Sequence, residues 1–80
     1  MSSSNETKYI NCYIEAFEVE ANKINEDLAY QTIPEWDSIG HMTLMSDLEE
    51  GFNISIDTDD IIDFSSFKKG IQILKKYKVV

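Results

Sequence analysis

The feature that most constrains the fold is a run of apolar residues with helical spacing over residues 38–51. The apolar positions lie three and four residues apart, as they do on one face of an α-helix. Asp37 precedes the run as a suitable N-cap, and Gly51 is expected to end the helix. Ser38 then lies in the first turn, where a helix N-terminus favours a phosphate. The apolar residues are Ile39, Met42, Leu44, Met45 and Leu48, and one of the two methionines is expected to stay at the surface.

Apolar spacing also predicts a helix near each end of the chain. The first begins near Ser3 or Ser4, because Ser3 and Glu6 have the spacing of a capping box, and ends within residues 19–22. The last opens at Ser65 or Ser66 and contains Gly70, which costs about 1 kcal/mol relative to alanine in a helix. The residues expected to face the core are Ile10, Tyr13, Ile14 and Phe17 in the first helix, and Phe67, Ile71, Ile73, Leu74 and Tyr77 in the last.

A long polar loop, residues 22–37, separates the first helix from the second. A connection of this length is unusual in a small domain unless it is functional or anchored by its own side chains. Pro34 stiffens the end of the loop. The apolar residues expected to anchor it are Leu28, Ala29, Tyr30, Ile33 and Trp36.

A connector and a short helix lie between the second and the last helix. Residues 52–56 alternate as a strand would, but no second alternating segment exists to pair with them. We therefore expect an extended connector. A short helix over residues 59–63 follows it, capped by Asp57 or Thr58. The residues of this helix expected to turn inward are Ile61 and Ile62.

Length and composition limit the class of protein. Eighty residues make a single domain, residues 1–80, that buries roughly 60% of its unfolded surface, which leaves little room for a deep catalytic cleft. Residues 1–4 are expected to be flexible. The sequence shows neither a run of about 18 apolar residues nor the features of a signal peptide, and its single cysteine, Cys12, is expected to be packed and unreactive. These features predict a cytoplasmic monomer.

Negative charge is concentrated in the middle of the chain. The chain has 15 acidic residues and 7 lysines, for a net charge of -8. Eight of the acids lie between Asp37 and Asp63 with no lysine among them, whereas the other seven balance the lysines. Such a surface attracts basic patches on proteins and repels phosphate backbones. The charge therefore argues against nucleic-acid binding and for a protein partner.

A resemblance to a known family lies in the residues around Ser38. The segment Trp-Asp-Ser-Ile-Gly-His-Met at residues 36–42, followed by Leu48-Glu49-Glu50 and Phe52, is similar to the phosphopantetheine attachment region of acyl and peptidyl carrier proteins. The likeness covers nearly the whole chain. It implies an all-α fold, a small four-helix bundle of the acyl-carrier-protein type with a long first loop and a short third helix. The apolar positions that extend the likeness beyond this segment are Ile54, Ile56, Ile61 and Phe64.

The resemblance implies a carrier protein and not an enzyme. Ser38 would be esterified with 4'-phosphopantetheine by a phosphopantetheinyl transferase, which Asp37 would help to position. The attached thiol would hold an acyl or aminoacyl group as a thioester, received from an acyl- or aminoacyl-activating ligase and passed to an acyltransferase or another thioester-using enzyme. The positions that match the family's partner-docking surface are Ile39, Met42, Thr43, Asp47, Glu49 and Glu50. Those that match its acyl pocket are Leu44, Leu48, Ile56, Ile61, Phe64, Gly70 and Ile73.

The sequence departs from the family pattern next to the attachment site. Trp36 stands where fatty-acid carriers usually have a small residue, and Gly40 and Thr43 replace acids often found on the docking helix. These differences suggest a dedicated carrier in a specialised pathway of fatty acid or secondary metabolite biosynthesis. Within the same resemblance, Gly70 is explained either by close packing or by room for a tethered acyl group.

Two other functions are compatible with some of the residues. An unmodified acidic helical adaptor that binds a basic protein surface explains the charge equally well, but not the serine with this flanking pattern. A small serine hydrolase could use Ser38, His41 and Asp37. However, the chain lacks a Gly-x-Ser-x-Gly elbow and is too short to enclose an oxyanion hole. His41 is instead expected at the surface of the partner-facing helix, and neither a catalytic residue nor a metal ligand is expected.

Overall fold

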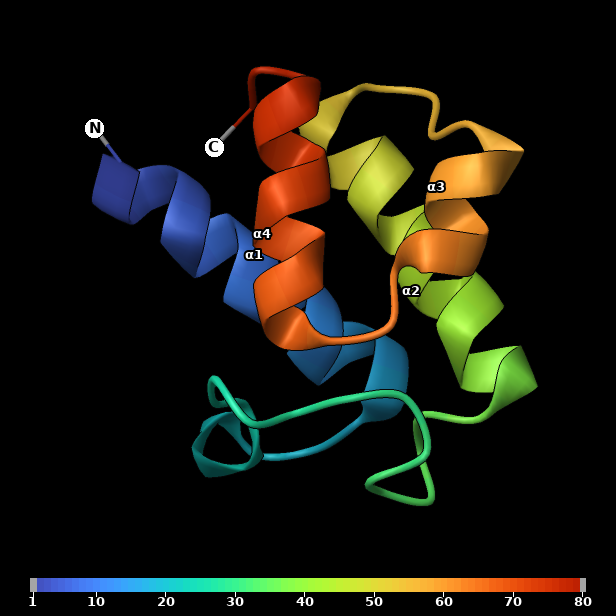
Figure 1. Cartoon of the computed structure of the whole chain (residues 1–80). Coiled ribbons are helices and arrows are strands. Elements are labelled where there is room, and N and C mark those ends of the chain that lie inside the picture. The colour runs from blue at the N-terminus through green and yellow to red at the C-terminus, as the bar shows by residue number, and fades with distance from the viewer. Residues whose placement is uncertain (1, 80) are drawn as a thin grey trace.

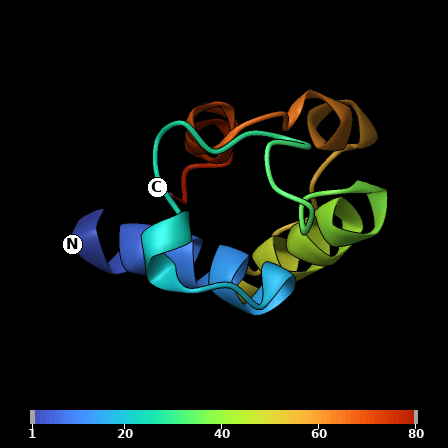
Figure 2. The ribbon, with the colours of Figure 1, turned by 90° about the horizontal axis from the view of Figure 1, so that it is seen from below.

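The computed structural model describes residues 2–79, and this part of the chain contains four α-helices and no strand. The helices are α1 (Ser2–Phe17), α2 (Ser38–Phe52), α3 (Thr58–Asp63) and α4 (Phe67–Lys76), and a 3-10 turn, η1 (Ala21–Lys23), lies in the first loop. In Figure 1 the long loop runs beneath the helices. Figure 2, seen from below, shows two layers, with α1 and α2 in one and α3 and α4 in the other. The predicted four-helix bundle, with its long first loop and short third helix, is confirmed.

The helices of this bundle are short. No helix within residues 2–79 combines the length and the apolar character that crossing a membrane requires.

The end of α2 is set by Asn53, and the prediction that Gly51 ends the helix is wrong. Gly51 lies inside α2, whereas Asn53 adopts the left-handed conformation with φ 56° and its N–H bonds to the carbonyl of Glu49. Asparagine is one of the few residues that enters this region readily, so it replaces glycine as the terminating residue. The connector that follows, residues 54–57, contains neither helix nor strand, in agreement with the expected connector.

The boundaries of α1 also differ from the prediction. The helix begins at Ser2, before the expected capping box, and ends at Phe17, because Glu18 turns into the left-handed region with φ 54°. The end therefore comes two residues before the predicted range. The flexibility expected of residues 1–4 stays a prediction, and Met1 lies outside the described residues.

The buried face of α1 is rotated relative to the predicted stripe. Tyr9 and Cys12 are buried beside Tyr13, whereas Ile10 and Ile14 are only half-buried. The hydroxyl of Tyr9 donates to the carbonyl of Phe67 at 2.7 Å and lies 2.8 Å from the hydroxyl of Tyr13. Since the Tyr9 proton goes to the carbonyl, Tyr13 donates to Tyr9, and both buried hydroxyls are satisfied. These bonds join α1 to α4.

Gly70 in α4 is required by close packing. A Cβ at this position would overlap the ring of Phe64 and the hydroxyl of Tyr9, both of which are buried. Of the two explanations for this glycine, close packing is therefore the one that the structure shows. Helix α4 begins directly after Ser66, as expected. The Ser66 side chain caps the helix by accepting the N–H of Lys69 at 3.0 Å.

The short helix α3 is held by a buried acid, and the prediction that Ile62 turns inward is wrong. Ile62 is 74% exposed, whereas Asp60 is buried. The two carboxylate oxygens of Asp60 accept bonds from Lys76 and from the hydroxyl of Tyr77, each at 2.6 Å. With Asp60 turned inward, its second neighbour along the helix points to solvent. An acid that is buried against polar partners from the end of α4 is not visible in an apolar pattern.

Substitutions of Gly70 and Gly51 by alanine are predicted to have opposite effects on stability. Gly70→Ala should lower the free energy of unfolding by about 1–3 kcal/mol, because the added methyl group overpacks the core at Phe64 and Tyr9. Gly51→Ala is the matched control. Its Cβ would only reach ordinary contact distance, 3.4 Å from the Cys12 sulfur, so it should stabilise by about 0.5–1 kcal/mol. Urea unfolding followed by circular dichroism measures both, and equal effects would contradict the packing assignment.

The Asp60 contacts predict an acid-sensitive stability. The Lys76 hydrogen bond, followed by that of Tyr77, lowers the pKa of the Asp60 carboxyl. The resulting stabilisation is present above the ordinary aspartate pKa of about 3.9 and is lost as the pH falls through the lowered native pKa. Asp60→Asn should therefore lower the urea midpoint at pH 7 and flatten its decline in acid. Asp59→Asn, on the exposed face of α3, should keep the wild-type decline; if both variants behaved alike, Asp60 would have no special part in it.

Candidate functional site

Ser38 is the first residue of α2, and its side chain is exposed beside the long loop. Asp37 is the N-cap, as predicted. Its side chain accepts the N–H of Gly40 at 2.8 Å, and its carbonyl accepts the N–H of His41 at 2.8 Å. Ser38 is therefore not needed as the cap. Its Oγ lies 3.0 Å from the hydroxyl of Tyr30 at the edge of the loop.

Trp36 fixes the loop immediately before Ser38. Its side chain is fully buried, with its ring 5.4 Å from the rings of both Tyr13 and Phe17 on α1. Its backbone N–H bonds to the carbonyl of Ile33, so the turn that leads into the helix is closed. The large residue at this position is thus a structural anchor, and the prediction that Trp36 holds the loop is confirmed.

His41 joins the loop to two helices, and the expectation that it lies at the surface is wrong. It is half-buried on α2, and its Nδ1 accepts the indole N–H of Trp36 at 2.9 Å. An indole nitrogen only donates, so Nδ1 carries no proton and Nε2 must donate to the carbonyl of Ile61 on α3, at 2.8 Å. Both imidazole nitrogens are engaged in structural bonds. His41 is therefore not placed to act as a base for Ser38.

The middle of the loop is attached to the start of α4. Tyr30 donates its N–H to the carbonyl of Ser65, and Phe67 donates its N–H to the carbonyl of Leu28, at 2.9 and 2.8 Å. These bonds form an isolated antiparallel bridge, and the Leu28 side chain is buried in the core. The expected anchoring by Leu28 is confirmed. The loop is thus held from α1 on one side and from α4 on the other.

Gly40 lets the loop lie directly against the first turn of α2. A Cβ at this position would overlap the carbonyl oxygen of Glu35 and lie 3.3 Å from the ring of Phe17. No larger side chain fits without moving the loop. This contact gives a physical reason for a glycine where the family resemblance would have an acid.

An apolar groove of about 320 Å³ opens beside Ser38, between the loop, α2 and α3. At its rim, Met42 is 54% exposed and Ile62 is 74% exposed, while Met45 is buried in the core, as expected of the methionine pair. Ile39, next to Ser38, is 79% exposed. The groove has no acidic or lysine side chain in its lining, which consists of Tyr30, Ser38, His41, Met42, Ile61, Ile62, Phe64 and Ser65.

The residues predicted to dock partners do not form one surface. Ile39, Met42 and Thr43 are exposed together in the first turns of α2. Glu49 is half-buried, and its carboxylate accepts the N–H of Ile56, which holds the connector after α2. Asp47 and Glu50 line a different groove. Their part in partner binding stays a prediction.

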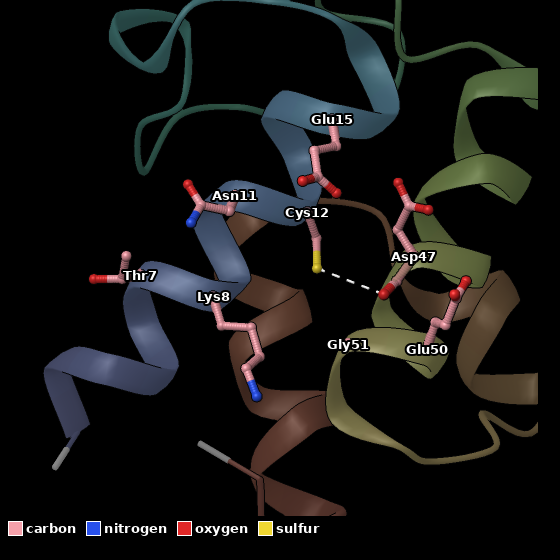
Figure 3. Close-up of a pocket in the computed structure, with 8 residues that line it drawn as sticks. All are labelled: Thr7, Lys8, Asn11, Cys12, Glu15, Asp47, Glu50 and Gly51. Atoms are coloured by element: carbon pink, nitrogen blue, oxygen red, sulfur yellow. Dashed lines mark hydrogen bonds between the residues drawn. The ribbon is translucent and has the colours of Figure 1, made fainter.

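That second groove, of about 610 Å³, lies between α1 and α2 (Figure 3). Burial raises the pKa of the Asp47 carboxyl, and the nearby charges of Glu15 and Glu50 raise it further. Cys12 is also buried here, and its thiol donates to the carbonyl of Asp47 with a sulfur–oxygen distance of 3.6 Å, drawn as a dashed line in Figure 3. Burial is the largest of the effects that raise the pKa of Cys12 to about 11. The prediction of a packed cysteine is confirmed, and its low reactivity stays a prediction.

The residues predicted to line an acyl pocket meet in the core behind the groove next to Ser38. All are buried except Ile61, which is half-buried and, with Phe64, forms part of the groove. The set consists of Leu44, Leu48, Ile56, Ile61, Phe64, Gly70 and Ile73. Apolar spacing did not identify Tyr30 and Ile62 as residues next to Ser38, because their positions depend on how the loop and α3 pack.

Within residues 2–79 no group of three His, Cys, Asp or Glu side chains is placed to hold a metal ion.

Comparison with known proteins gives one informative similarity. The chain is 30% identical over 64 residues to a protein named "Acyl carrier protein" from Lactobacillus johnsonii (strain CNCM I-12250 / La1 / NCC 533), an alignment that covers 80% of each chain. No family model matches the sequence, and no solved structure matches it.

The contact between Trp36 and His41 predicts a loss of stability when the indole is removed. Trp36→Phe should lower the free energy of unfolding by about 1–3 kcal/mol, because Nδ1 of His41 loses its donor in a half-buried place. Tyr30→Phe, which removes an exposed hydroxyl from the same loop, should change stability by no more than about 0.5 kcal/mol. Urea unfolding followed by circular dichroism compares the two, and a stable Trp36→Phe variant would contradict the anchoring role.

Proposed function

The chain belongs to the acyl carrier protein family, and we propose on that premise that it carries an acyl or aminoacyl group on 4'-phosphopantetheine attached to Ser38. The observation that carries the proposal is the exposed Ser38 hydroxyl at the start of α2, with the capping role taken by Asp37. The residues on both sides of Ser38 are fixed to the core through Trp36 and His41. The serine is therefore both accessible and held in place.

The surroundings of Ser38 fit a phosphate-linked group. The partial positive charge of a helix N-terminus favours a phosphate at this position. The Ser38 hydroxyl projects beside an uncharged groove, and its polar neighbour is the hydroxyl of Tyr30. When bound, the phosphopantetheine would supply a terminal thiol for thioester formation.

The activation of Ser38 comes from another protein in this proposal. Both nitrogens of the nearby imidazole, His41, are used in structural bonds, so the chain offers no base for the hydroxyl at this place. A phosphopantetheinyl transferase would bring coenzyme A, the metal ion and the proton acceptor, and Asp37 would help to position it. The chain itself is a carrier and performs no reaction.

The partners that we propose are enzymes that load and unload the thioester. An acyl- or aminoacyl-activating ligase would load the carrier, and an acyltransferase or another thioester-using enzyme would unload it, in a specialised pathway in the cytoplasm. Exposed apolar residues in the first turns of α2 offer such enzymes a contact next to Ser38, and the acids farther along the helix add negative charge at a distance from it. The residues that we propose for partner binding are Ile39, Met42, Thr43, Asp47, Glu49 and Glu50.

Incubation with a promiscuous phosphopantetheinyl transferase, Mg²⁺ and coenzyme A tests the attachment site. The intact mass should rise by one phosphopantetheine in the wild type and in Ser46→Ala, which removes an exposed serine from the same helix. Ser38→Ala should gain nothing. Circular dichroism of each variant shows whether it is folded. If folded wild-type protein gained no mass with several transferases, the carrier function would be refuted and an unmodified acidic adaptor would be the better account.

A further inference from the structure

We infer that the cargo of this carrier stays outside the helical bundle, and that the acyl groups carried are short or polar, the aminoacyl class included. The inference rests on the proposed attachment to Ser38. It follows from what lies between Ser38 and the interior, where side chains close the route in two successive layers.

The first layer is His41, at the inner side of the groove next to Ser38. Its two hydrogen bonds connect the loop at Trp36 with α3 at Ile61, so the imidazole crosses from one side of the groove to the other. A chain that entered the bundle between α2 and α3 would have to break the bond to the Ile61 carbonyl. A half-buried imidazole and a carbonyl would then lack their partners, which opposes such an opening.

The second layer is the ring of Phe64, behind His41. The centroids of the two rings are 6.2 Å apart, and Phe64 is buried at the base of the groove. The far edge of its ring contacts Gly70, and the hydroxyl of Tyr9 lies against the same glycine. The space that a small residue leaves in α4 is therefore already filled by two aromatic side chains.

The filling of this space is fixed by polar bonds as well as by packing. Tyr9 is bound to Phe67 and to Tyr13, and no buried side-chain nitrogen or oxygen of the described residues lacks a partner. Displacing Tyr9 to admit an alkyl chain would place at least two hydroxyls in an apolar interior without partners. An apolar side chain at position 9 would move more easily. The interior of this bundle is thus closed to an alkyl chain.

The groove outside is too small to replace an internal pocket. Its volume of about 320 Å³ is at the lower limit of pockets that enclose small ligands, and the attached arm would share it. A long saturated chain would remain in contact with water, which is unfavourable in proportion to its apolar area. Short acyl groups and groups with their own polar atoms do not have this cost. This difference defines the class of cargo.

A series of loaded carriers tests the inference on the full-length protein. A promiscuous transferase would attach acetyl-, alanyl-, octanoyl- or palmitoyl-phosphopantetheine from the corresponding coenzyme A thioester, and intact mass would confirm each product. Cleavage of each thioester by hydroxylamine is then compared with cleavage of the same acyl group on free pantetheine. The ratio of the cleavage rate on the carrier to the rate on free pantetheine should be the same for all four acyl groups within about twofold, because none is sheltered from the reagent by the protein. The melting temperature should likewise not rise with chain length.

Removal of the imidazole tests the closing role of His41. In His41→Ala, cleavage of the octanoyl thioester should become slower than that of the acetyl thioester by about threefold or more, as the chain gains access to the apolar side chains behind. Ser46→Ala on the same helix should behave as the wild type. Should His41→Ala prove unfolded by circular dichroism, His41→Asn, which keeps a polar side chain of smaller size at this position, takes its place with the same expectation.

The outcomes separate this inference from the proposed function. Failure of every loading reaction on folded protein would refute the attachment to Ser38, and the inference with it. If loading succeeded and the protection of the thioester from hydroxylamine rose about tenfold from acetyl to palmitoyl in the wild type, the inference alone would be refuted. Equal cleavage in wild type and in the opened variants would refute the closing role of His41.

Discussion

The hydrogen bond from the Trp36 indole to the His41 imidazole is the contact on which the position of Ser38 depends. Trp36 precedes the serine by two residues and His41 follows it by three, so this one bond closes the chain around Ser38. The indole is buried against α1, and the imidazole continues the connection to α3. As a result Ser38 is exposed while its backbone is tied to the core on both sides. The large side chain of Trp36 thus fixes the position of Ser38 and takes no part in its chemistry.

The aromatic interior explains how a short chain with a long loop can fold without a disulfide. Aromatic side chains bury much area each, and tyrosine also offers a polar atom that can bond across the core. Here the Tyr9 hydroxyl connects α1 to the backbone of α4, and Trp36 connects the loop to α1. Gly70 lets α4 approach these rings closely. Stability and closure of the interior therefore come from the same residues.

Local signals in the sequence were sufficient for the elements that local chemistry decides. The caps at Asp37 and Ser66 depend on neighbouring residues, and the structure confirms them. It was harder to predict which residues of α1 and α3 face the core. Tyr9 and Asp60 are buried because their polar partners come from α4 and its C-terminal end. Apolar spacing contains no information about such distant partners. The attachment site was found by family resemblance, but its surroundings, including the groove beside it, required the fold.

The burial of Cys12 has a consequence for the selectivity of thiol chemistry on this protein. Cys12 is the chain's one cysteine, it is buried between α1 and α2, and burial raises its pKa to about 11. Only a thiolate attacks a thioester or an alkylating reagent readily, so at neutral pH this side chain is a poor competitor. A thiol attached at Ser38 would therefore not lose its acyl group readily to Cys12. The same difference would direct maleimide reagents to the attached arm in preference to Cys12.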